Sequence, residues 1–193
     1  MQILGKILGS EAKVKIMRLF LLNKSKGFKV AEIAKRSRVS PETVRRELKQ
    51  LAAASFAKKK SEDWHFNPIF KYSREIEDLL INTDTIDTEG IVNTFKSSGK
   101  IKLVLVSGIF MKNKDSRIDL LVVGDQMKKG KIEESIRKLE AEIGAELVYA
   151  IFETKEFLYR LNMYDKLVRD ILDFPHEVLI QGKELSTQTL KKA

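Results

Sequence analysis

The sequence predicts an α+β protein built from two modules. Its 193 residues suit two small domains, each with a core of its own. Hydrophobic periodicity is helical in the first part, whereas strands and helices alternate in the second. Residues 1–81 hold 18 Lys/Arg against 9 Asp/Glu, and residues 82–193 hold 18 of each, so the first part carries the whole net charge of +9. We expect modules at 1–81 and 90–193, joined by a polar linker at 82–89.

The first module is predicted to consist mainly of helices. Helices are expected at 10–22, 30–37, 40–54 and 73–81, and a hairpin is expected from strands at 56–60 and 64–66. The start at residue 40 is the strongest signal, because Ser40 can cap a helix that begins at Pro41, with Glu42 in the first turn. Val44 and Leu48 begin an apolar stripe, which leaves a basic face outward.

This order of elements resembles the winged helix-turn-helix family over residues 8–70. The resemblance implies that 30–37 supports a recognition helix at 40–54 and that 56–66 is the wing. Double-stranded DNA is the implied partner, since Lys and Arg that neutralise phosphates release counterions. The implied DNA-binding residues are Ser40, Thr43, Arg45, Arg46 and Lys49 on the helix, and Lys58, Lys59 and Lys60 on the wing.

Two other interpretations of this module remain open. The basic face is equally that of any solvated amphipathic helix, and modules of this kind also dock proteins. Trp64 and Phe66 are expected to pack at the base of the hairpin rather than to stack on bases, and His65 is expected at the surface.

The second module is predicted to be an α/β domain with a small mixed sheet. Strands are expected at 102–106, 118–123, 147–152 and 178–180, and helices at 90–95, 128–143, 154–161 and 165–172. The apolar stripe of the last two helices fits either the core or the seam of a homodimer.

The stretch LVSGIFMKNKDSRIDLLVV, residues 105–123, resembles the signature of minimal nucleotidyltransferases. In that family a strand ends in a glycine that approaches nucleotide phosphates, and two carboxylates on the next strand and one on a later strand hold Mg²⁺. Gly108 matches the glycine, Asp119 the second carboxylate and Glu146 the third. Arg117 stands at the first carboxylate, where a guanidinium has no lone pair for a metal.

These departures favour a domain without catalytic activity. Asp115 cannot replace the missing acid, because residues 115 and 119 of an extended strand lie about 13 Å apart. That is too far for both to bind two metal ions about 4 Å apart. Either Asp119 and Glu146 bind one weak cation, or Arg117 lies between them in an internal ion pair, and we favour the ion pair. We therefore expect no metal and no cofactor, with Mg²⁺ required only if the site is active.

The composition excludes several other classes of protein. Without cysteine the chain has no disulfide scaffold, thiolate zinc site or thiol nucleophile. No apolar run approaches the roughly 20 residues of a membrane helix, and residues 1–10 lack the pattern of a secretory signal. The cytoplasm is the expected location.

The sequence therefore predicts a DNA-binding transcriptional regulator whose second domain senses a signal or assembles subunits. One alternative is an active Mg²⁺-dependent nucleotidyltransferase, and another is an antitoxin-like module that binds a protein. The target DNA, the effector and the oligomeric state are left open.

Overall fold

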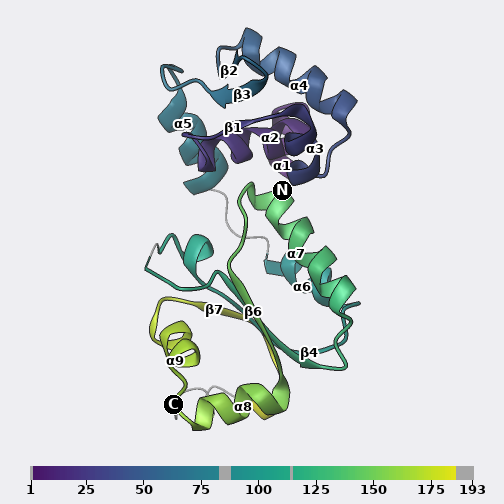
Figure 1. Ribbon diagram of the computed structural model, residues 1–193, viewed down its shortest axis with the longest axis vertical. Helices are drawn as coiled ribbons and strands as arrows, with labels where there is room; N and C mark the ends of the chain where they lie inside the picture. The colour runs from purple at the N-terminus through teal and green to yellow at the C-terminus, as the bar shows by residue number, and fades with distance from the viewer. Residues whose placement is uncertain (1, 83–87, 114, 186–193) are drawn as a thin grey trace. The chain divides into compact units, whose positions relative to one another are not determined.

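The computed structural model describes residues 2–82, 88–113 and 115–185, which form a mixed α+β structure with two sheets (Figure 1). The chain divides into two compact units, residues 1–85 with 137–146, and residues 86–136 with 147–193. Most of the expected linker at 82–89 falls on 83–87, outside the described residues. Both of its ends are corrected, because Asn82 ends a π-helical turn and Thr88 and Glu89 already belong to a helix. No helix in the described ranges is long and apolar enough to cross a membrane.

The first unit contains the predicted helices and hairpin. Its elements are α1 (Gln2–Ile7), α2 (Glu11–Leu22), β1 (Gly27–Phe28), α3 (Val30–Ser37), α4 (Pro41–Ala53), β2 (Ala57–Lys60), β3 (Asp63–Phe66), α5 (Ser73–Glu77) and a π-helical turn (Asp78–Asn82). The predicted boundaries of α2, α3, α4 and the hairpin are confirmed within one residue. The sequence pattern did not predict α1 and β1, because both elements are too short to show a clear period.

The core of this unit lies between α2, α3, α4 and a three-stranded sheet of order β1-β3-β2. Phe20 and Phe28 meet edge to face at its centre and are fully buried. The sheet pairs Phe28 with Trp64, which is half-buried against this core. Trp64 therefore packs against this core, but it lies one pair from the turn of the hairpin. Phe66 is buried at the base of the hairpin, where it pairs with Ala57, as the sequence predicted.

Residues 137–146 belong to the first unit because of contacts with α2. The buried guanidinium of Arg18 donates to the carbonyl oxygens of Leu80 and Glu142, each at 3.0 Å. Gly144 has φ of +91°, and a side chain there would meet the backbone of α2. Carbonyl groups at the end of a helix lack helical partners, so a buried arginine is suited to this position.

The second unit alternates strands and helices. Its elements are α6 (Thr88–Phe95), β4 (Lys100–Val106), a 3-10 turn (Gly108–Met111), β5 (Leu120–Asp125), the first part of α7 (Lys129–Ile143), β6 (Tyr149–Glu153), α8 (Thr154–Asn162), α9 (Lys166–Asp173), β7 (Glu177–Gln181) and a 3-10 turn (Lys183–Leu185). Every predicted strand and helix of this module is confirmed within two residues.

The sheet of the second unit has the order β6-β5-β4-β7 and is mixed, because β5 and β6 are parallel while the other pairs are antiparallel. Its central strands are buried on both faces. Leu103 and Leu121 pack with α8 and α9, while Val104 and Val122 on the other face are also fully buried. Figure 1 shows α6 on the side of the sheet away from α9. A sheet covered on both faces explains the continuous apolar runs of β4 and β5.

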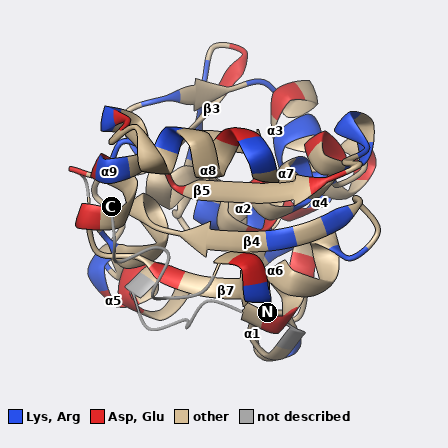
Figure 2. Cartoon of the chain, turned by 90° about the horizontal axis from the view of Figure 1, so that it is seen from below, with Lys and Arg blue, Asp and Glu red and all other residues tan. Residues whose placement is uncertain are grey.

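An ion cluster joins three segments of the second unit at one end of this sheet. The ammonium of Lys102 lies 2.8 Å from Asp125 and 2.5 Å from Glu184. Figure 2 shows the basic start of β4 beside the acidic end of β5. These contacts raise the pKa of Lys102 above its ordinary 10.5, with the hydrogen bond to Asp125 as the largest cause. The same bond is the main reason that the pKa of Asp125 is lowered from 3.8.

This cluster predicts a pH-dependent loss of stability in Lys102→Met. Because the pKa of Asp125 is lowered, its contribution is present above pH 3.8 and is lost as the pH falls through its folded pKa. Because the pKa of Lys102 is raised, its contribution is present below pH 10.5 and is lost as the pH rises through its folded pKa. We expect a lower thermal midpoint than wild type at pH 7, and a smaller difference in strong acid or base.

Circular dichroism melting across this pH range measures the effect. Lys100→Met is the matched control, because Lys100 is exposed on the same strand and has no ion pair among the described residues. Equal midpoints for the two variants at pH 7 would contradict the assignment.

Candidate nucleic-acid interface

The start of α4 is fixed by its cap. Ser40 is the N-cap, and its Oγ accepts the N–H of Thr43 at 3.2 Å. Its hydroxyl also donates to Thr43 Oγ1 at 2.9 Å. Pro41 occupies the first turn, where its missing N–H leaves no helical bond unmade. The cap confirms the predicted helix start. The hydroxyls of Ser40 and Thr43 are hydrogen-bonded to each other.

The outer face of α4 is basic and exposed. Val44, Leu48 and Leu51 are buried in the core, so the helix presents its opposite side to solvent. Arg45, Arg46, Lys49 and Gln50 are exposed on that side, while Thr43 is half-buried. The structure thus brings the predicted helical site residues together on one capped helix.

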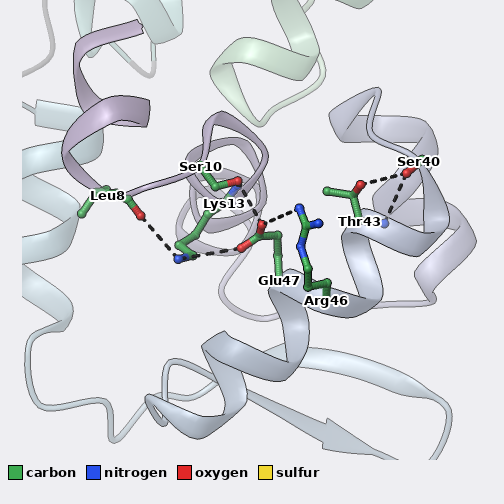
Figure 3. A network of polar contacts seen from close by, with 7 residues as sticks. All are labelled: Leu8, Ser10, Lys13, Ser40, Thr43, Arg46 and Glu47. Atoms are coloured by element: carbon green, nitrogen blue, oxygen red, sulfur yellow. Dashed lines mark hydrogen bonds and ion pairs between the residues drawn. The ribbon is translucent and has the colours of Figure 1, made fainter.

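Glu47 is a member of this helix that the sequence analysis missed. It is 2% exposed, although it lies between exposed Arg46 and the buried stripe. Its Oε1 accepts the hydroxyl of Ser10 at 3.0 Å and Nη2 of Arg46 at 3.4 Å (Figure 3). The ammonium of Lys13 lies 3.8 Å from Oε2. A charge this deeply buried requires such partners.

The partners of Glu47 could not be found from sequence. Ser10 stands 37 residues earlier and is itself the N-cap of α2, where it accepts the N–H of Lys13. Periodicity gives the face of a residue on its own helix, but not which other helix packs there. The only local signal is the position of Glu47 at the border of the apolar stripe.

The three lysines of the hairpin divide between the two faces of the sheet. Lys58 pairs with His65, Lys59 with Trp64, and Lys60 with Asp63. Cross-strand partners share a face, and neighbours along a strand point to opposite faces. Lys58 and Lys60 therefore lie on the face of half-exposed His65, while Lys59 lies on that of Trp64. All three lysines are exposed.

The predicted nucleotide site is built differently from the expectation. Asp119 precedes β5, and its two oxygens accept the N–H groups of Ile109 at 2.8 Å and Val148 at 2.9 Å. Gly108 has φ of +52°, which directs the following N–H toward this carboxylate. Asp119 therefore ties two loops of the second unit together.

The expected ion pair of Arg117 with Asp119 and Glu146 is wrong. Arg117 instead lies 2.6 Å from Asp170 of α9, and Glu146 contacts Arg36 within the first unit. Both partners are remote in sequence, so the local motif did not reveal them. No cluster of three His, Cys, Asp or Glu suited to a metal occurs among the described residues.

Comparisons with protein families, with curated proteins and with solved structures found no match for this chain.

The contact between Gly108 and Asp119 predicts a marked effect of Gly108→Ala. A Cβ there would lie closer to Asp119 Oδ1 than van der Waals radii allow, and 3.0 Å from the carbonyl oxygen of Ile118. The positive φ adds backbone strain. We expect a loss of about 2–4 kcal/mol in the free energy of unfolding, through strain and the broken Asp119 bond.

Urea titration measures this loss, with Gly130→Ala as the matched control. Gly130 lies in the first turn of α7, and a Cβ added there would have no neighbour within 4 Å, so alanine is expected to leave the stability unchanged or to raise it by up to about 1 kcal/mol. Two variants of equal stability would show that Gly108 does not fix the position of Asp119.

Proposed function

We propose that this chain is a DNA-binding transcriptional regulator that docks on duplex DNA through α4 and the β2–β3 hairpin. The observation that carries the proposal is the exposed basic face of capped α4, followed directly by a hairpin with three exposed lysines. A helix of this kind fits the major groove, and its long basic side chains reach base edges and phosphates.

The topology of the first unit supports this proposal. The order α2, β1, α3, α4, β2 and β3, with a sheet of order β1-β3-β2, is what a winged helix-turn-helix requires. In this assignment α3 supports α4, and the turn at Arg38 lies in the left-handed region with φ of 53°. The confinement of the net charge to residues 1–81 supports a polyanionic partner for this unit.

For the second unit we propose a role in sensing or assembly without nucleotidyl transfer. Both oxygens of Asp119 are occupied by backbone N–H groups, so the carboxylate serves as a structural clamp. Arg117 is directed to Asp170 on α9. In the proposed role, Gly108 and Asp119, which match the nucleotidyltransferase signature, keep the ends of the strands together.

The proposal predicts salt-dependent binding that requires the outer face of α4. We expect the affinity for a labelled 30-bp duplex of mixed sequence to fall steeply as KCl rises from 50 to 200 mM, by about tenfold for every few phosphates contacted. Arg45→Ala with Arg46→Ala is expected to lower the affinity at least about tenfold and to reduce the salt slope by at least about one. Fluorescence anisotropy measures both quantities.

The charge-matched control is Lys155→Ala with Lys166→Ala, since both lysines are exposed on helices of the second unit. This control is expected to leave binding near that of wild type. Absence of duplex binding by the wild-type chain at 50 mM KCl, or an equal loss in the control, would overturn the proposal.

A further inference from the structure

The cations on the outer face of α4 differ in how firmly they are held. Among the described residues, Arg46 has a carboxylate partner, Glu47, whereas Arg45 and Lys49 have none. The Arg46 side chain is 65% exposed and that of Glu47 is 3% exposed. An exposed guanidinium is therefore held against a buried acid, while the cations beside it extend into solvent.

The Glu47 carboxylate is itself held by residues at the start of α2. Ser10, at the start of α2, donates to the same Oε1 that accepts Arg46, and Lys13 of α2 faces the other oxygen (Figure 3). Lys13 is in turn bonded to the carbonyl oxygen of Leu8 at 3.4 Å. The carboxylate cannot turn away without losing these contacts, so Glu47 is a rigid support for Arg46.

The helical angle of Arg46 places it at the centre of the outer face. At about 100° per residue, Arg46 lies nearly opposite both Val44 and Leu48, which are fully buried. Consecutive residues on a helix do not face each other, so the contact with Glu47 requires the Arg46 side chain to bend along the surface. The guanidinium thus has a preferred direction before any ligand arrives.

We propose that Arg46 is the specificity-determining residue of α4 and that Glu47 is the positioning residue that orients its guanidinium toward a base edge; this inference rests on the DNA-binding function proposed above. Arginine reads guanine through two parallel hydrogen bonds, which demand a defined plane and direction. A guanidinium that is already held loses less rotational freedom on binding. Arg45 and Lys49, without such support, contact phosphates, where only charge is required.

The test begins with selection from a library of 30-bp duplexes that carry a randomised 16-bp centre, using the full-length wild-type chain. The selected duplex and a scrambled duplex of the same composition are then the two probes. Dissociation constants are measured for both probes with wild type, Glu47→Gln, Arg46→Lys, Arg45→Ala and Glu42→Gln. The ratio of the two constants is the discrimination.

We expect Glu47→Gln and Arg46→Lys to lower the discrimination about five- to tenfold, with less than about a twofold change in affinity for the scrambled duplex. Arg45→Ala is expected to weaken binding of both probes equally. Glu42→Gln is the charge-matched control, because Glu42 is exposed on the same helix, and it is expected to keep the discrimination of wild type. Arg46→Lys keeps the charge, so it remains informative if Glu47→Gln does not fold.

A double-mutant cycle separates positioning from folding. In the Arg46→Ala background, Glu47→Gln is expected to cause no further loss of discrimination, because the group that it orients is gone. An equal loss in that background, or unchanged discrimination in folded Glu47→Gln or in Arg46→Lys, would overturn the inference. Failure of the wild-type chain to enrich or bind any duplex would instead overturn the proposed function itself.

Discussion

The candidate interface depends on the contacts that the buried carboxylate of Glu47 makes. It lies on the inner border of α4, yet its partners come from the start of α2 and from the outer face of α4 itself. Because a buried charge without partners costs several kcal/mol, α2 and α4 must pack in the one register that brings Ser10 and Lys13 to it. This register agrees with the burial of Val44, Leu48 and Leu51, which leaves the basic side of α4 in solvent.

The same principle organises the second unit, where a carboxylate again fastens segments that are distant in sequence. Asp119 accepts two backbone N–H groups from different loops, and Asp125 bonds Lys102 at the opposite end of β5. Asp125 also accepts the N–H of Thr154 at the start of α8. Asp119 and Asp125 thus have structural partners, which agrees with our proposal that this unit does not catalyse nucleotidyl transfer.

Local patterns predicted most of the fold. The Ser40 cap, the stripe of Val44 and Leu48, and the apolar runs of β4 and β5 all act within a few residues, and the structure confirms their elements. The contacts that complete each site were not predictable in this way. The bond between Glu47 and Ser10 spans 37 residues, and Arg117 pairs with an acid 53 positions later. Such pairs depend on how elements pack, which periodicity does not encode.

The most direct test of the central claim is amide hydrogen exchange of the full-length chain with and without a 30-bp duplex at low salt. We expect new protection at residues 40–50 and in the hairpin at 57–66, with no new protection across β4 and β5. Protection confined to the second unit, or exchange that the duplex leaves unchanged, would contradict the claim that α4 and the hairpin form the DNA-binding surface.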